Sequence, residues 1–163
     1  MKKRIIALGL LWCLSAVMLQ AARVDTVLVR SAAMNKDVKV VYVLPDKAIG
    51  KQACPVVYLL HGYGGNARSW MQLKPELPQM ADEKGIIFVC PDGKNSWYWD
   101  SPENPAYRYE TFVTSELVKY TDGNYATIPD RKARAISGLS MGGHGALWSA
   151  CLLYTSPSPR DRG

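Results

Sequence analysis

The stretch ARAISGLSMGGHGALWSA, residues 133–150, decides the fold. Apolar residues in Ala133–Ser137 predict a strand, and the small residues of Gly142–Ala150 predict the start of a helix. The connection Gly138–Gly142 matches the pattern G-x-S-x-G, with Ser140 at its centre. Glycines on both sides of a serine let strand and helix approach closely and expose the serine on a strained turn. We therefore expect Ser140 to be a nucleophile; the alternative is an ordinary glycine-rich turn between strand and helix.

A second glycine-rich segment, HGYGG at His61–Gly65, lies upstream of the turn Gly138–Gly142, which we call the elbow. It follows Pro55–Leu60, a continuous apolar run that is typical of a strand buried on both faces. In enzymes with a G-x-S-x-G elbow, such a loop supplies backbone N–H groups to the developing oxyanion. We expect the N–H groups of Tyr63 and Met141 to form this oxyanion hole. The alternative is a glycine turn without a catalytic part.

The remaining pattern predicts alternating strands and helices. Arg23–Arg30 and Asp37–Leu44 alternate apolar and polar residues around a turn at Asn35, which favours an antiparallel pair at one sheet edge. The later segments predict a loop over Pro45–Ala53, a helix from Asn66 or Ser69 to Lys84 that Pro75 and Pro78 kink or split, a strand over Gly85–Cys90 and a helix over Tyr109–Tyr120. Such alternation indicates an α/β fold with a mostly parallel sheet covered on both faces.

The N-terminus has the layout of a secretory signal peptide over residues 1–22. Basic residues at 2–4 precede an apolar run from Ile5 to Leu19, and the small residues Ala21 and Ala22 follow. The apolar run is shorter than the roughly 20 residues that span a bilayer, so we expect no stable membrane anchor after cleavage. Cleavage is expected after Ala21 or Ala22, and the mature protein is expected to be secreted or periplasmic.

Net charge argues against a nucleic-acid partner. The chain carries a formal charge of +6, but four of these charges belong to the leader and to the last residues of the chain. The body is therefore nearly neutral and has no long basic run.

Two of the four cysteines, Cys54 and Cys90, lie in this body, at opposite ends of neighbouring predicted strands. They are expected to be too far apart for a disulfide and to be buried, unpaired thiols.

Residues 151–163 differ in composition from the rest of the chain. The predicted helix changes there into a Ser/Pro tract, and the string resembles one reading frame of a transposase adapter used in sequencing libraries. We expect this tail to be non-native, with a natural linker as the alternative. The domain then comprises residues 23–150, the N-terminal portion of a fold through the nucleophile elbow.

Several motifs in a fixed order resemble one esterase family of α/β hydrolases, which includes S-formylglutathione hydrolases, the mycolyltransferase antigens, and feruloyl and acetylxylan esterases. The matching segments are Tyr58–Gly65 with Trp70, Pro91–Gly93, Ser96–Pro102, Tyr109–Phe112, Glu116–Leu117 and Ser137–Ala146. The resemblance implies an α/β-hydrolase sandwich that acts on carboxylic esters or thioesters. It also implies an Asp and a His well downstream of the serine.

The sequence departs from that family pattern in its histidines. Only His61 and His144 are present; His61 lies in the predicted oxyanion loop, and His144 is expected to pack or hydrogen-bond beneath the elbow. Neither is expected to be the base. The four aspartates at 92, 100, 122 and 130 all precede Ser140 and are poor candidates for the acid. We therefore expect the catalytic acid and base beyond the end of this chain, and the 163-residue chain to be inactive.

Trp97, Tyr98 and Trp99 form an aromatic cluster after a strand end, where ligands bind in open α/β sheets. They are interpreted as a wall of an acyl or sugar pocket, or alternatively as simple packing.

The leader and the resemblance together favour a secreted serine esterase that acts on acetyl or feruloyl esters of polysaccharides, through an acyl-enzyme on Ser140. The alternatives are an acyltransferase to a sugar acceptor and a non-catalytic carbohydrate-binding relative. We expect no cofactor and no metal ion.

Overall fold

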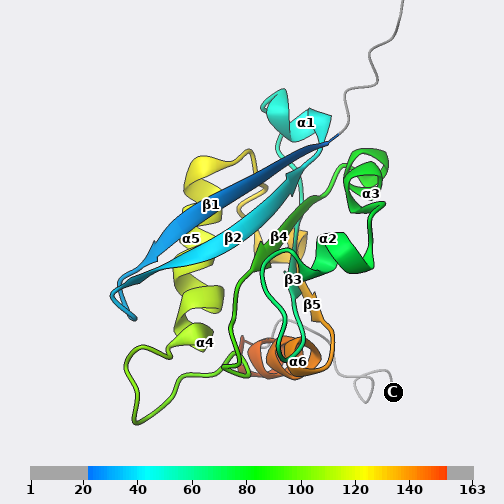
Figure 1. Cartoon of the computed structure of the whole chain (residues 1–163). Coiled ribbons are helices and arrows are strands. Elements are labelled where there is room, and N and C mark those ends of the chain that lie inside the picture. The colour runs from blue at the N-terminus through cyan, green and yellow to red at the C-terminus, as the bar shows by residue number, and fades with distance from the viewer. Residues whose placement is uncertain (1–21, 154–163) are drawn as a thin grey trace, which may run out of the picture.

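A five-stranded mixed sheet forms the centre of the molecule (Figure 1). The computed structural model describes residues 22–153; the predicted leader up to residue 21 and residues 154–163 of the predicted tail lie outside the described residues. The strands are β1 (Arg23–Ser31), β2 (Lys36–Leu44), β3 (Val56–Leu60), β4 (Ile87–Pro91) and β5 (Arg134–Gly138). They lie side by side in the order β1-β2-β4-β3-β5.

The predicted antiparallel pair at one edge of the sheet is confirmed. Strands β1 and β2 pair from Arg23 opposite Leu44 to Ser31 opposite Lys36. Asn35 closes the turn with a φ of +50°, a conformation that asparagine tolerates better than most residues. The pair exposes charged side chains along its outer strand, as an edge strand in contact with water does.

Strands β4, β3 and β5 are parallel to one another. Strand β3 pairs with β4 on one side and with β5 on the other, from Val56 opposite Arg134 to Leu60 opposite Gly138. The carboxyl ends of the three strands therefore meet at one edge of the sheet, where ligands bind in open α/β sheets. The loops that begin at His61 and Asp92 and the turn at Leu139 all start from this edge.

The connecting segments contain short helices. These are α1 (Asp46–Ile49), α2 (Ser69–Leu73), α3 (Leu77–Lys84), α4 (Tyr109–Thr111), the π-helical turn η1 (Phe112–Glu116), α5 (Leu117–Asn124), the 3₁₀ turn η2 (Arg131–Ala133) and α6 (Met141–Leu153). The predicted helix around Pro75 is split into α2 and α3, as expected, and Pro78 stands in the first turn of α3. The prediction of a loop over Pro45–Ala53 missed the short helix α1, which begins at Asp46 with Pro45 as its N-cap.

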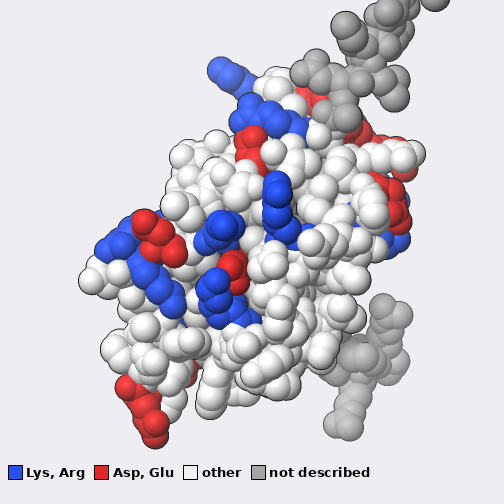
Figure 2. All heavy atoms as spheres, in the orientation of Figure 1, with Lys and Arg blue, Asp and Glu red and all other residues white. Residues whose placement is uncertain are grey.

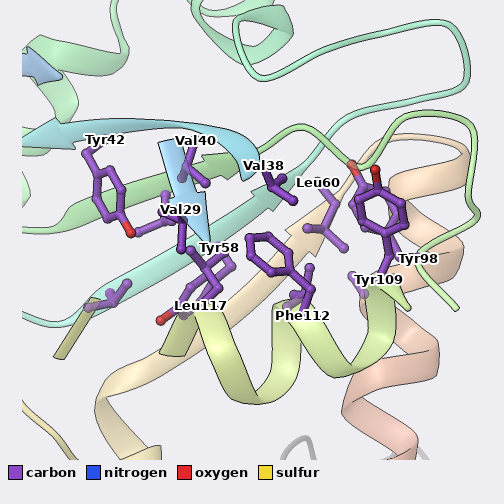
Figure 3. Packing of buried hydrophobic residues seen from close by; sticks show 14 of the residues in the cluster. Val29, Val38, Val40, Tyr42, Tyr58, Leu60, Tyr98, Tyr109, Phe112 and Leu117 are labelled. Atoms are coloured by element: carbon purple, nitrogen blue, oxygen red, sulfur yellow. The ribbon is translucent and has the colours of Figure 1, made fainter. Parts of the chain in front are cut away.

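Alternate residues of the central strands enter two separate hydrophobic cores, because successive side chains of a strand point to opposite faces. On one face Val40 and Tyr42 join Phe112 and Leu117 in the cluster drawn in Figure 3. On the other face the neighbouring strand residues pack with α2 and α3. The buried members there are Ala22, Val41, Val43, Leu59, Ala67, Leu77, Ala81, Phe88 and Cys90. Both faces of the sheet are therefore covered.

Cys54 and Cys90 are buried and unpaired, as predicted. The pairing of Val56 with Ile87 in neighbouring parallel strands places Cys54 just before β3 and Cys90 near the end of β4. Burial raises the pKa of the Cys90 thiol to about 12, so it stays protonated at neutral pH.

The surface of the described residues mixes charges of both signs. Figure 2 shows blue Lys and Arg side chains intermingled with red Asp and Glu side chains on the face it draws. This pattern agrees with a body that is nearly neutral. Between residues 22 and 153, no helix combines the length and the apolar character that crossing a membrane requires.

Candidate active site

Ser140 lies on a sharp turn between β5 and α6. Its φ is +54°, in the left-handed region that side chains other than glycine rarely adopt. The residue is exposed, and Leu139 N–H still pairs with the Leu60 carbonyl at 3.2 Å, so the turn begins directly at the end of the sheet. This is the geometry of a nucleophile elbow, in which a strained turn presents the serine hydroxyl at the carboxyl edge of the sheet.

The two glycines of the G-x-S-x-G pattern are required by close packing. A Cβ on Gly138 would lie 2.2 Å from the backbone of Gly142. A Cβ on Gly142 would lie 2.2 Å from the Leu60 carbonyl oxygen of β3. No side chain fits at either distance, so the tight crossing of β5, β3 and α6 depends on the two glycines that the sequence pattern singled out.

The His61–Gly65 loop lies directly against the elbow. A Cβ on Gly62 would meet the Leu139 carbonyl oxygen at 3.3 Å and the Ser140 Cβ at 3.6 Å. The predicted oxyanion loop and the predicted nucleophile, 78 positions apart, are therefore neighbours. The absence of a side chain at Gly62 leaves room for a substrate carbonyl beside Ser140.

The two N–H groups predicted to hold an oxyanion are free of partners within residues 22–153. Tyr63 N–H donates to no backbone or side-chain acceptor of the described residues. Met141 is the first residue of α6, so its N–H has no acceptor inside the helix, and the described part of the chain offers it none elsewhere. Unpaired N–H groups beside a nucleophile are what an oxyanion hole requires.

His61 is fully engaged in shaping its own loop. Its Nε2 accepts the Gly93 N–H at 2.9 Å, and its Nδ1 lies 2.7 Å from the Gly62 carbonyl oxygen. Because Nε2 accepts and a carbonyl can only accept, the ring is neutral with its proton on Nδ1. The side chain is also buried, with 1% of its surface exposed. His61 therefore cannot act as the base of Ser140 from this position.

Comparison with known families agrees with this arrangement. The family model described as "Putative esterase" matches residues 31–156. The chain belongs to this esterase family. The resemblance that the motifs indicated is thereby confirmed.

Three relatives illustrate the range of the esterase family. An acetyl esterase of Caldicellulosiruptor saccharolyticus is 30% identical over 125 residues, which cover 72% of this chain and 46% of the relative. The diacylglycerol acyltransferase/mycolyltransferase Ag85A of Mycobacterium gordonae is 32% identical over 134 residues, 76% of this chain and 37% of the relative. The solved structure of a ferulic acid esterase superposes with a TM-score of 0.69 at 30% identity, over 80% of this chain and 55% of that one.

These likenesses confirm the α/β-hydrolase fold class. The chain spans about half the length, or less, of the curated relatives it matches.

The interpretation of Tyr98 as part of a pocket wall was wrong, because the Tyr98 side chain is buried in the protein. Tyr98 has no exposed surface, and its side chain fits against two glycines. An added Cβ would lie 2.2 Å from the Tyr98 ring at Gly93, and at Gly145 it would lie 2.5 Å from the Tyr98 Cβ and 2.8 Å from the ring. His61 N–H donates to the Tyr98 hydroxyl oxygen at 3.0 Å, and the hydroxyl points back to the His61 carbonyl at 3.4 Å. Burial raises the pKa of Tyr98 far above its ordinary value, so the hydroxyl stays protonated. Tyr98 thus supports the His61–Gly65 loop from the protein interior.

Trp97 and Trp99 are both about half exposed, so they remain candidates for contact with a substrate. Trp97 lies edge-on to the ring of His144, with ring centroids 5.5 Å apart, and His144 stacks on Trp148 at 6.3 Å. His144 is exposed in this aromatic group, instead of lying beneath the elbow as expected. Its backbone N–H donates to the Ser140 carbonyl at 3.0 Å, so the aromatic group starts one helical turn from the nucleophile.

Each of the four aspartates considered above for the acid, at positions 92, 100, 122 and 130, has another partner. Asp100 accepts from the N–H and the hydroxyl of Thr111, and Asp130 accepts the Lys132 N–H. Asp122 pairs with the guanidinium of Arg134 and with the Thr127 hydroxyl, and Asp92 pairs with the Lys94 ammonium at 2.8 Å. These contacts stabilise loops and turns, which agrees with the expectation that none of them is the catalytic acid.

Proposed function

We propose that the protein is a serine carboxylesterase in which Ser140 forms the acyl-enzyme. The observation that carries the proposal is the strained, exposed Ser140 with Gly62 packed against it, together with free N–H groups on Tyr63 and Met141, the residues that follow Gly62 and Ser140. In this mechanism the Ser140 oxygen attacks the ester carbonyl, and the two N–H groups stabilise the tetrahedral oxyanion. The alcohol then leaves, and water hydrolyses the acyl-enzyme.

In the proposed mechanism, Ser140 transfers its proton to a histidine that lies outside this 163-residue sequence. His61 uses both ring nitrogens inside its loop, and His144 points into the group formed with Trp97 and Trp148. The 163-residue chain by itself is then expected to lack turnover. The complete gene product would contain the acid and the base after residue 150, in the order Ser, Asp, His.

For the substrate we propose acetyl or feruloyl esters of polysaccharides, outside the cytoplasm. Two family relatives support this choice, one named an acetyl esterase and one a ferulic acid esterase. The basic and apolar leader supports export. The half-exposed rings of Trp97 and Trp99 offer flat apolar surfaces that suit an aromatic acyl group or a sugar face.

Labelling with a fluorophosphonate tests the nucleophile. The complete gene product should be labelled at Ser140, and Ser140→Ala should abolish labelling and lower turnover of p-nitrophenyl acetate by about 10⁴-fold or more. Ser115→Ala is the matched control, because Ser115 is a partly exposed serine on η1, outside the turn that holds Ser140, and should keep full activity. Equal activity of Ser140→Ala and the parent protein would overturn the proposal.

A second candidate is acyl transfer to a sugar hydroxyl, which the likeness to the mycolyltransferase Ag85A favours. Both reactions use the same acyl-enzyme and differ only in the group that attacks it. Incubation with an activated ester and a sugar acceptor such as trehalose, followed by product analysis, separates them. Free acid indicates hydrolysis, and acylated sugar indicates transfer. Glycan binding that survives Ser140→Ala, without either product, would instead identify a non-catalytic carbohydrate-binding protein.

A further inference from the structure

One carboxylate holds the first described residue to the body of the protein. The backbone nitrogen of Ala22 donates to Asp82 Oδ2 at 2.7 Å, and Asp82 Oδ1 accepts the Asp46 N–H at 2.8 Å. Asp82 lies on α3, so it joins the starts of β1 and α1 to a helix that is distant in sequence. Ala22 itself is buried, with 7% of its surface exposed, in the same cluster as Leu77 and Ala81.

The Asp82 carboxylate has no cationic partner among residues 22–153. Its described partners are the two neutral backbone N–H groups, and the ion pairs of this part of the chain involve other acids. A charged donor adds to such a hydrogen bond a Coulomb attraction to the carboxylate that a neutral N–H does not supply. A positive charge on the Ala22 nitrogen would therefore complete this contact without any change of geometry.

We propose that a peptidase cleaves the bond between Ala21 and Ala22, and that the new α-ammonium of Ala22 binds Asp82. Hydrolysis adds one water across the peptide bond and leaves a carboxylate on Ala21 and an amine on Ala22. The amine takes up a proton at neutral pH, because an α-amino group has a pKa near 8. Its nitrogen already lies at hydrogen-bond distance from Asp82.

The contact distinguishes between two cleavage sites that the sequence left open. Cleavage after Ala22 would remove the buried alanine and its nitrogen, and Arg23 would become the first residue. The Arg23 guanidinium already binds Asp25, with its Nε 2.9 Å from both carboxylate oxygens. Only cleavage after Ala21 places the new charge at Asp82. This inference does not depend on the esterase activity.

The first test is the N-terminal sequence of the exported protein. The complete gene with its own leader is expressed in a bacterial host, and the protein is recovered from outside the cytoplasm. Edman sequencing and intact mass should give Ala22 as the first residue. A first residue of Arg23, or a chain that keeps its leader, would overturn the proposal.

The second test measures the ammonium–carboxylate contact itself. A site-specific protease releases two versions of the complete protein from a fusion, one starting at Ala22 and one at Arg23. The Ala22 version should melt about 3 °C or more above the Arg23 version. Asp82→Asn should reduce this difference to less than about half, because the amide keeps an acceptor oxygen but loses the charge.

Glu83→Gln is the matched control, because Glu83 is an exposed acid next to Asp82 on α3. It should leave the difference between the two versions unchanged. If Asp82→Asn also leaves the difference unchanged, or if both versions melt at the same temperature, the proposed contact of the N-terminus is wrong.

Discussion

The loops that follow β3 and β4 leave the same edge of the sheet but are built in opposite ways. The loop His61–Gly65 is rich in glycine and leaves the Tyr63 N–H free beside Ser140. The loop Asp92–Asp100 turns its polar groups inward; Ser96, for example, donates to the Gly93 carbonyl at 2.6 Å and accepts the Tyr98 N–H at 3.1 Å. One loop thus leaves an N–H donor free, and the other uses its donors in internal hydrogen bonds.

Three backbone N–H groups donate hydrogen bonds between the two loops. Gly93 N–H donates to His61 Nε2, His61 N–H donates to the Tyr98 hydroxyl oxygen, and Gly64 N–H donates to Asn95 Oδ1 at 2.8 Å. The free donors of the first loop are therefore positioned by the second. If this interpretation holds, changes in the second loop should affect both stability and the reactivity of Ser140.

The largest effect is expected from Gly93→Ala. The new Cβ would lie 2.2 Å from the Tyr98 ring, so the ring or the loop must move. Overpacking of this kind should lower the free energy of unfolding by about 3 kcal/mol, measured by urea denaturation. Gly123→Ala is the control, because nothing lies within 4 Å of its Cβ position and alanine favours the α5 helix. A loss below about 1 kcal/mol at Gly93 would contradict the close packing of the two loops.

Tyr98→Phe removes one hydroxyl and should have the next largest effect. It leaves the buried His61 N–H without an acceptor, which should cost about 2 kcal/mol of stability. If the proposed esterase activity is present, kcat/KM for p-nitrophenyl acetate and the rate of Ser140 labelling should both fall about tenfold, because Tyr63 N–H is no longer held in place. Tyr107→Phe, at a partly exposed ring, serves as the control. Full stability with full reactivity would show that Tyr98 does not position the loop.

Asp92→Asn tests the electrostatic part of the second loop. Burial alone would raise the pKa of Asp92, but the Lys94 ammonium at 2.8 Å and the Lys94 N–H at 3.1 Å hold it well below its usual range. His61 Nε2 lies 3.6 Å from this carboxylate but accepts the Gly93 N–H, so it donates nothing to Asp92. The substitution should cost about 1 kcal/mol at pH 7.

The loss of folding stability caused by Asp92→Asn should depend on pH and should become smaller as the pH falls. A carboxylate with a lowered folded-state pKa stabilises the fold fully above its unfolded pKa of about 3.9, and this contribution is lost as the pH falls below that value. Urea midpoints of the parent and of Asp92→Asn should therefore begin to converge near pH 5 and continue to converge as the pH falls towards the lowered folded-state pKa of Asp92. The difference in urea midpoint between the parent and Lys94→Met should change less with pH, because this substitution removes only one of the two donors to the Asp92 carboxylate. A gap that is constant over this range would contradict the charged role of Asp92.

Asn95→Ala should have the smallest effect. It removes an exposed acceptor from Gly64 N–H and should cost about 0.5 kcal/mol. The labelling rate of Ser140 should fall only a few-fold, since the other two hydrogen bonds that backbone N–H groups donate between the loops remain. Asn104→Ala removes a similar bond, to the Ala106 N–H, outside this pair of loops and should leave the labelling rate unchanged. An equal effect of both changes would indicate that Asn95 has no special role.

The difference between the two loops also explains what the sequence could predict. The elbow around Ser140 and the His61–Gly65 loop carry local signals, because glycines at fixed spacing follow apolar runs. The burial of Tyr98 carries no such signal. Trp97 and Tyr98 both have a φ of +57° without being glycine, and this conformation, imposed by contacts distant in sequence, turns the Tyr98 ring into the core. The sequence placed the aromatic cluster on the right loop but could not assign a direction to each side chain.

The fold shows the same division. The strands and the split at Pro75 follow from periodicity and from proline chemistry, and both were predicted. The π-helical turn Phe112–Glu116 was not, because its cause is tertiary. Glu116 accepts the Ser31 hydroxyl at 2.5 Å and the Ala33 N–H at 2.8 Å, and these bonds tie the turn to the β1–β2 hairpin. Contacts between residues more than 80 positions apart leave no trace in local periodicity.

The ring of Tyr98 between Gly93 and Gly145 has a consequence for protein engineering. The three positions belong to a loop and to helix α6, which follows Ser140, and a side chain at position 93 or 145 would overlap the tyrosine at position 98. A mutant library that varies them one at a time would return almost only damaged variants and would suggest that the region is intolerant to change. Joint randomisation, with a smaller ring at position 98 and larger residues at 93 and 145, would explore combinations that single steps do not reach.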